Sequence, residues 1–231
     1  MKNPSRSLRL RCALALLCNL LAATFVAYCV VSLLLSGSAK EDALTVRGFI
    51  CFRYFTVDSN ILAALSCLLL SGYQIAFLLG KIDIIPTFVY IFKFIGCCAV
   101  AVTLLTVVFF LGFVYGYAVL FSGVSFYLHL VCPLLCAVSF VFLEGGRIPR
   151  RLAVLGALPV FLYGAVYLPA VLVFSAWPDF YHFNAGGRWY ISLPVMYAAA
   201  VAIAFGARAL HARFAPSRPL SYDRSDLPPC S

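Results

Sequence analysis

The apolar residues of this chain fall into six long runs. They cover residues 12–35, 55–79, 88–112, 124–143, 152–174 and 190–207. A helix needs about 20 mostly apolar residues to cross a bilayer, whereas a transmembrane β-strand shows about ten residues of alternating polarity. These runs have the length of helices and show no such alternation. The pattern therefore predicts an all-α polytopic membrane protein with six transmembrane helices.

The segments that join the six runs are short, between 8 and 19 residues long. Short connections favour antiparallel neighbours, so we expect an up-and-down bundle that forms one domain over residues 1–207. Residues 208–231 are polar, basic and contain four prolines. We expect them to form a disordered cytoplasmic tail near anionic lipid headgroups.

Composition supports this class and fixes an orientation. Hydrophobic residues make up 64% of the chain and charged residues 11%, against about 45–50% and about 25% in soluble domains. A soluble domain, a disordered chain and a nucleic-acid partner are therefore excluded despite the net charge of +9. With the N-terminus inside, twelve Lys and Arg lie in cytoplasmic segments and four in outer loops. The positive-inside rule then predicts that both termini are cytoplasmic.

The first apolar run also has the basic flank of a signal peptide, with a small-residue segment at 37–39 as a cleavage site. Its 24 apolar residues exceed the ~7–15 of a signal peptide. We therefore expect it to remain as a span, and its removal would leave five.

Ten cysteines are present, and eight of them lie within the apolar runs, where Cys behaves as a small hydrophobe. Neither a metal-ligand spacing nor a cofactor motif is present, so we predict packing residues and no metal or cofactor.

Lys93 lies near the start of the third run. We expect its long side chain to snorkel to the cytoplasmic interface.

The densest group of polar residues in a span is at 54–60, at the outer start of the second run. Thr56, Ser59 and Asn60 have the spacing i, i+3, i+4 and therefore share one helix face. Capping of the helix start is the alternative, and Asp58 also suits a first turn. Capping explains Asn60 less well, because it lies a full turn inside.

His129 is the one histidine within the six runs, and Pro133 follows four residues later. Pro133 has no N–H, so the carbonyl of His129 loses its helical partner and the helix should kink or open. The second and fourth runs both start outside, which places His129 and the segment 56–60 at comparable depth. A purely structural hydrogen bond remains the alternative for His129. The aromatic outer loop at 177–182 fits either an interfacial belt or a lid.

Two segments carry a resemblance to a known family. Residues 52–62 read F-x-Y-F-T-x-x-S-N-x-L, and H-x-x-x-P follows at 129–133. They resemble the bacterial six-span "Pr-six-Pr" membrane proteins, which in turn are similar to the androgen-induced and androgen-dependent transmembrane proteins of animals. The resemblance implies residence in a bacterial plasma membrane.

The animal proteins are threonine hydrolases of fatty acid esters of hydroxy fatty acids. The resemblance implies that Thr56 is the nucleophile and His129 the base. Such chemistry needs a base within reach of the hydroxyl, and donors for the developing oxyanion. Ser59 or Asn60, one turn from Thr56, could supply those donors.

Two functions from different classes remain open at this point. One is an intramembrane hydrolase of lipid esters that uses Thr56 and His129, with membrane lipids as partners or substrates. The other is a non-enzymatic small transporter or lipid-binding protein in which the same polar residues hold a ligand or a proton. A structural or assembly role is a third reading. Transporters usually have internal repeats and broken helices near the midplane, which this sequence does not show.

Overall fold

The computed structural model describes residues 6–35, 48–184 and 186–215, which are mostly helical with no strand among them. Six helices are long and apolar enough to cross a membrane, as the sequence predicts. The chain is therefore an integral multi-pass membrane protein. The six spans are Arg6–Leu35, Phe55–Leu78, Thr87–Tyr115, Gly123–Leu143, Arg150–Val173 and Trp189–Phe214.

Three of the spans are α-helices throughout: α1 (Arg6–Leu35), α2 (Phe55–Leu78) and α9 (Trp189–Phe214). The other three contain wider or tighter turns. The third joins α3 (Thr87–Thr106), the π-turn η2 (Val107–Leu111) and α4 (Gly112–Tyr115). The fourth joins α6 (Gly123–Phe126), η3 (Tyr127–Val131), α7 (Cys132–Val138) and η4 (Ser139–Leu143). The fifth joins the 3₁₀ segment η5 (Arg150–Ala157), α8 (Leu158–Leu168) and η6 (Pro169–Val173).

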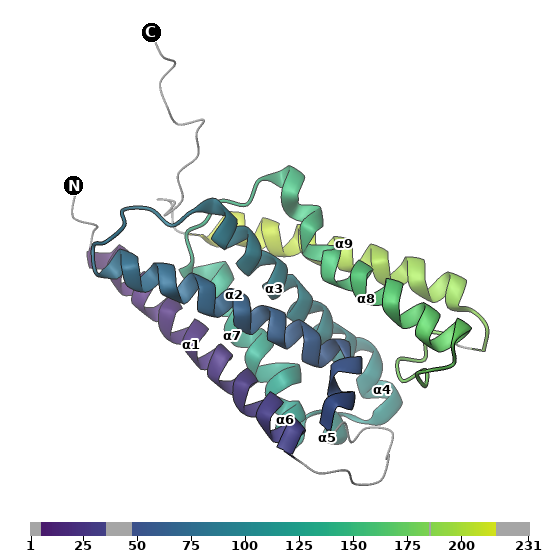
Figure 1. Ribbon diagram of the computed structural model, residues 1–231. Coiled ribbons are helices and arrows are strands. Elements are labelled where there is room, and N and C mark those ends of the chain that lie inside the picture. The colour runs from purple at the N-terminus through teal and green to yellow at the C-terminus, as the bar shows by residue number, and fades with distance from the viewer. Residues whose placement is uncertain (1–5, 36–47, 185, 216–231) are drawn as a thin grey trace.

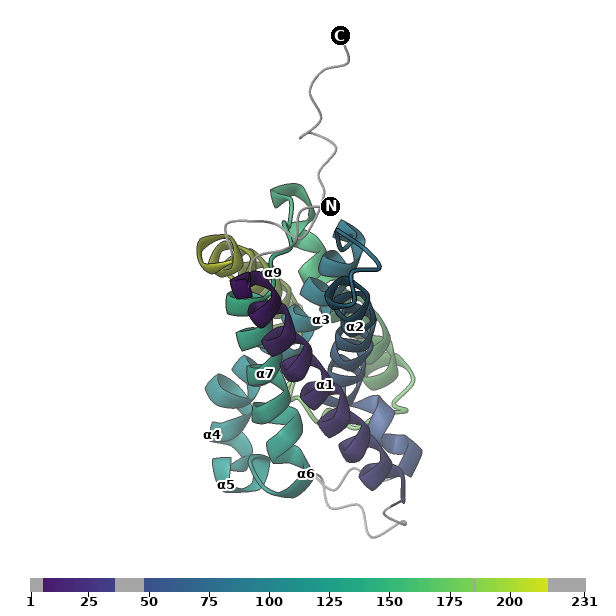
Figure 2. The ribbon, with the colours of Figure 1, turned by 90° about the vertical axis from the view of Figure 1, so that its left-hand side faces the viewer.

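Two short helices lie outside the spans, η1 (Gly48–Arg53) before α2 and α5 (Tyr117–Leu120) between the third and fourth spans. The start of α1 and the end of α9 lie at one end of the bundle, which we call the terminal end (Figures 1 and 2). The opposite end, where α2 and α9 begin, is called the far end.

The bundle has two parts (Figure 1). Helices α1, α2, α3 and α7 pack together around the largest apolar cluster, to which Leu70, Phe94 and Phe140 contribute. Helices α8 and α9 pack on one another through Val160 and Ala200. The third span is the most buried, with 56% of its most apolar stretch inside the protein against 11% for the sixth. Helix α3 therefore lies between the two parts and contacts both.

The main departure from the predicted spans is at the C-terminal side. Helix α9 continues to Phe214, so the first residues of the expected tail, 208–214, are helical. His211 consequently lies in the sixth helix, where it is 2% exposed and stacks on Phe140. The expected cleavage site at 37–39 and the rest of the tail lie outside the described residues.

Candidate functional site

A cavity of about 500 Å³ lies between α3 with η2 on one side and α8 and α9 on the other. Its wall is mostly apolar. Phe109, Phe110 and Val195 belong to this wall and are also among the exposed large hydrophobic residues. The cavity therefore opens sideways, between η2 and α9, onto a surface that would face lipid. The hydroxyl-bearing residues of the wall are Thr56, Thr103, Thr106, Tyr163, Tyr181 and Ser192.

Thr56 lines this cavity from the first turn of α2. The first N–H groups of a helix have no partner within it. In α2 the N–H groups of Val57 and Asp58 bond to the carbonyl of Tyr54, at 3.0 and 3.2 Å. Within the described ranges, the N–H groups of Phe55 and Thr56 have no backbone acceptor. Two N–H donors that the backbone does not use therefore lie next to the Thr56 hydroxyl.

Tyr181, from the loop before α9, lines the same cavity. Its hydroxyl is buried and has no hydrogen-bond partner in the part of the chain that the structure describes. Burial raises the pKa of Tyr181, and the neighbouring Thr56 hydroxyl and the N–H groups of Phe55 and Thr56 oppose that rise. A neutral phenol therefore lies beside Thr56 with its proton available to a ligand.

The carboxylate of Asp179 makes three of the hydrogen bonds that hold the loop carrying Tyr181. Asp179 accepts hydrogen bonds from the Tyr167 hydroxyl and from the N–H of Phe183 at Oδ1, and from the N–H of Asn184 at Oδ2, each at 2.8 Å. Phe180 stacks on Tyr54 at 4.3 Å, directly before α2. The loop at 177–182 thus packs over the start of α2, as a lid would, and inserts Tyr181 into the cavity wall.

Ser59 and Asn60 are buried on the face of α2 that the spacing predicts, and neither lines the cavity. The Ser59 hydroxyl bonds to the Thr56 carbonyl at 3.1 Å and lies 2.8 Å from the hydroxyl of Thr103. Asn60 Nδ2 donates to the carbonyls of Thr56, at 2.7 Å, and Leu128, at 3.0 Å. Their donors therefore hold the backbone around Thr56, and an oxyanion in the cavity would need other donors.

The fourth span opens next to Pro133, as the sequence predicts, and the opening also affects the carbonyl of Leu128. In the π-turn η3 the N–H of Cys132 bonds to the carbonyl of Tyr127, five residues back. The next residue is proline, so the Leu128 carbonyl is left without a helical partner. Asn60 of α2 supplies the missing donor. A side chain of the second span thus supplies the hydrogen bond that the opening of the fourth span removes.

His129 lies within η3 and is 8% exposed. Its Nδ1 is 2.7 Å from the carbonyl of Leu120. A carbonyl can only accept, so Nδ1 carries the proton, and Nε2 of the neutral ring is the basic nitrogen. Leu120 packs in one cluster with Val107, Leu111 and Tyr181, which all line the cavity. His129 itself lies behind this wall.

The backbones of the two candidate catalytic residues are therefore held by one amide, since Asn60 bonds to Thr56 and to the residue before His129. Within the described ranges, no hydrogen bond joins the Thr56 and His129 side chains directly. Tyr181 and the two N–H groups were not predicted from the sequence. Only the aromatic character of the loop at 177–182 pointed toward them.

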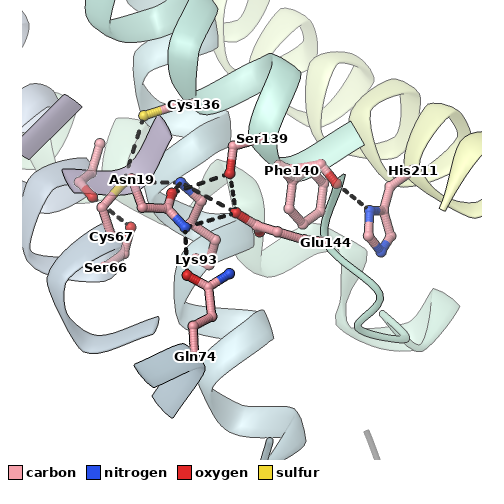
Figure 3. A network of polar contacts seen from close by, with 11 residues as sticks. Asn19, Ser66, Cys67, Gln74, Lys93, Cys136, Ser139, Phe140, Glu144 and His211 are labelled. Carbon is pink, nitrogen blue, oxygen red and sulfur yellow. Dashed lines mark hydrogen bonds and ion pairs between the residues drawn. The ribbon is translucent and has the colours of Figure 1, made fainter. Parts of the chain in front are cut away.

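A second polar cluster lies nearer the terminal end and corrects the prediction for Lys93 (Figure 3). Lys93 does not snorkel: its side chain is 0% exposed, about 9 Å along α3 from the first residue of the helix. Its Nζ donates to Asn19 Oδ1 at 2.7 Å and to Cys67 Sγ at 2.9 Å. Glu144 Oε1 lies 3.8 Å away as the counter-ion.

Asn19 is the centre of this cluster. Its Nδ2 donates to Gln74 at 3.3 Å and to Glu144 at 3.1 Å, and its Oδ1 also accepts from Ser139 at 3.2 Å. The Ser139 hydroxyl, which has one proton to donate, also contacts Glu144 Oε1. The sequence placed Glu144 in a joining segment, yet it is 1% exposed. This cluster connects α1, α2, α3 and the end of the fourth span.

Comparisons with known protein families, with curated proteins and with solved structures found no match to this chain.

Proposed function

We propose that this protein binds a lipid acyl chain in the cavity and hydrolyses an ester of that lipid with Thr56 as nucleophile. The observation that carries the proposal is the position of Thr56, in the wall of an apolar cavity that opens sideways toward lipid. Apolar walls with a few convergent polar groups are the usual character of a small-molecule site. An acyl chain fits the walls, and its ester group would lie at the start of α2.

The proposed chemistry begins with attack of the Thr56 hydroxyl on the ester carbonyl. His129 takes the hydroxyl proton at Nε2 and returns it to the leaving alkoxide, which gives a threonyl ester that water then hydrolyses. The Leu120 carbonyl holds the imidazole in the required tautomer, a role that a carboxylate has in many triads. Transfer requires Nε2 to reach the Thr56 hydroxyl directly or through one water.

The oxyanion that forms during attack needs donors on the cavity side. The N–H groups of Phe55 and Thr56, which the backbone does not use, and the hydroxyl of Tyr181 are the donors that lie there among the described residues. The N-terminus of α2 also favours negative charge. This assignment replaces Ser59 and Asn60, whose donors bond to backbone carbonyls and support the site from behind.

A non-enzymatic lipid-binding protein is the second candidate, and one observation favours it. His129 lies behind the cavity wall and has no hydrogen bond to Thr56 among the described residues. In that case the same cavity holds an acyl chain, and Thr56 and Tyr181 bind its polar end without turnover.

We also propose the orientation and location of this activity. The twelve basic residues that share one side with the termini favour a cytoplasmic terminal end. The opening and Thr56 would then lie toward the outer leaflet of a bacterial plasma membrane. Ester substrates in that leaflet could enter sideways between η2 and α9.

The test is made on the full-length protein in lipid nanodiscs. A fluorophosphonate probe reports the nucleophile, and hydrolysis of a p-nitrophenyl ester of a long-chain fatty acid reports turnover. We expect Thr56→Ala to abolish both and Thr56→Ser to retain labelling. His129→Ala should lower the turnover rate by about 10²-fold or more, as loss of a general base does.

Thr106→Ala is the matched control, because Thr106 lines the same cavity and has no part in the chemistry. It should leave both readouts unchanged. Unchanged labelling in Thr56→Ala would overturn the enzyme proposal. Binding of a photoreactive fatty acid ester by the wild type, without any turnover, would establish the lipid-binding alternative instead.

A further inference from the structure

Two thiols face each other inside the bundle, away from the cavity. Cys67 of α2 and Cys136 of α7 place their sulfur atoms 3.8 Å apart, and both residues are fully buried (Figure 3). A disulfide has a sulfur–sulfur distance of about 2.05 Å. The two sulfur atoms would therefore have to approach by somewhat less than 2 Å to form a bond.

The two thiols are not equivalent. The ammonium of Lys93 donates a hydrogen bond to Cys67 Sγ at 2.9 Å. The thiolate is the reactive form of cysteine, and an adjacent lysine stabilises it. Cys136 interacts with the sulfur of Cys67 and has no hydrogen bond to Lys93. Cys67 is therefore suited to react first, with Cys136 placed to react second.

We propose that Cys67 and Cys136 form a redox-active dithiol that closes to a reversible disulfide when the protein meets a peroxide. The Cys67 thiolate attacks one oxygen of hydrogen peroxide, which gives a sulfenic acid on Cys67 and releases hydroxide. Cys136 then attacks the sulfur of that sulfenic acid and displaces a second hydroxide. The two thiol protons neutralise the hydroxides, so two thiols and one peroxide yield one disulfide and two waters.

The Lys93 ammonium can relay these protons, because it lies against the first sulfur. It gives a proton to the leaving oxygen and recovers one from the Cys136 thiol. A small external dithiol reverses the reaction by thiol–disulfide exchange.

Closure of the disulfide changes the charge balance around Lys93. A disulfide sulfur is neutral and a weak acceptor, so Lys93 loses its partner on α2. Asn19 and Glu144 remain, and Glu144, at 3.8 Å, is then the one anion left beside the ammonium among the described residues. Oxidation therefore draws the lysine toward the fourth span and connects α2 to α7 covalently.

The experiment treats the reduced full-length protein in nanodiscs with hydrogen peroxide, blocks the remaining thiols, and maps the digested peptides by mass spectrometry without reductant. We expect a Cys67–Cys136 cross-link to be the main product and dithiothreitol to remove it. Lys93→Met should slow its formation by about tenfold or more, because the thiolate loses its ammonium. Lys93→Arg, which keeps the charge, should slow it less.

Cys132 provides the matched control. It lies one turn before Cys136 on the same helix and is equally buried, but its thiol contacts the Ala22 carbonyl at 3.9 Å and has no hydrogen bond to Lys93. Cys132→Ser should leave the cross-link unchanged, whereas Cys136→Ser should stop the reaction at the sulfenic acid of Cys67. Cys132 in Lys93→Met should stay as unreactive as in wild type, which reports that the bundle is folded. Absence of the cross-link in the wild type, or an equal rate in Lys93→Met, would overturn the proposal.

Discussion

The two polar regions of this bundle differ in how completely their hydrogen-bond donors are used. Around Lys93, the described side chains form what we call the closed cluster, in which the Lys93 ammonium and the Asn19 amide have partners and Glu144 Oε2 is an unpaired acceptor. Around Thr56, the Tyr181 hydroxyl has no partner and the first N–H groups of α2 have no backbone acceptor among the described residues, and a cavity lies in front of them. Both regions lie at membrane depth, where polar groups are costly.

This difference in the use of donors distinguishes polar residues that hold helices together from polar residues that are placed to bind a ligand. A satisfied network in a packed core stabilises one arrangement, whereas unpaired donors beside a cavity can bind a group that is not part of the chain. Asn60 shows that a residue that holds helices together can also support a residue that faces the cavity. It holds the backbone of Thr56 while using both of its own N–H donors.

The largest expected effect is on the closed cluster. Lys93→Met should lower the free energy of unfolding by about 3–5 kcal/mol, because it leaves the buried Glu144 without its counter-ion. Unfolding by denaturant in detergent micelles, followed by circular dichroism, measures this loss.

The double variant Lys93→Met/Glu144→Gln provides the control, since the glutamine is neutral and still accepts from Asn19. It should be more stable than Lys93→Met alone. Equal stability of Lys93→Met and of the double variant would show that the unpaired Glu144 costs nothing, and the contrast between the two regions would then fail.

A smaller loss of stability is expected at Asn60, which holds two helices together and also supports Thr56. Asn60→Leu leaves the Leu128 carbonyl buried and unpaired, which costs about 1–3 kcal/mol of unfolding free energy. The cause is the missing N–H of Pro133. In a Pro133→Ala background the new N–H can supply that donor, so the cost of Asn60→Leu should fall clearly.

Ser66 is a suitable comparison, because it lies on the same helix, is as buried as Asn60, and bonds only to its own helix at Ala63. Ser66→Ala should cost the same with and without Pro133. If the cost of Asn60→Leu is also independent of Pro133, then Asn60 does not compensate for the helical opening.

Much of the fold follows from hydropathy, because a bilayer requires long apolar helices and leaves few other solutions. The six helices match the six apolar runs, and the opening of the fourth span follows from the missing N–H of Pro133. The end of α9 was predicted too early, because Arg208 and His211 read as a polar tail. In the structure both bond to carbonyls of the segment at 140–148, which a one-dimensional pattern does not reveal.

The site was predictable only where the signal is local. The spacing of Thr56, Ser59 and Asn60 predicts one shared helix face. In the structure Ser59 and Asn60 are buried between helices, whereas Thr56 lines the cavity. The partners of Lys93 come from three other spans, so its burial depends on tertiary contacts and the snorkelling prediction was wrong. Tyr181 lies more than a hundred residues from Thr56, and nothing near it in sequence indicates that its hydroxyl enters the cavity.

The smallest expected effect concerns the loop that carries Tyr181. Asp179→Ala removes three hydrogen bonds that hold the loop, and Asp179→Asn keeps acceptance at one oxygen only. Because the loop lies at the far end and outside the six spans, global unfolding should change little. Local opening should rise, so amide exchange at Phe183 and Asn184 should be about tenfold faster in Asp179→Ala, as loss of ~1.4 kcal/mol of local stability gives.

The far-end tyrosine Tyr117 gives a control that touches neither Asp179 nor the cavity. Its hydroxyl bonds to the Val108 carbonyl at 2.7 Å, so Tyr117→Phe removes one exposed hydrogen bond and should leave exchange at Phe183 unchanged. If Asp179→Ala also leaves that exchange unchanged, the loop is held by aromatic packing such as Phe180 on Tyr54. Tyr181 would then be held in the cavity wall as firmly as the side chains of the closed cluster are held in the core. The far end would in that case differ from the Lys93 region only in its unpaired donors.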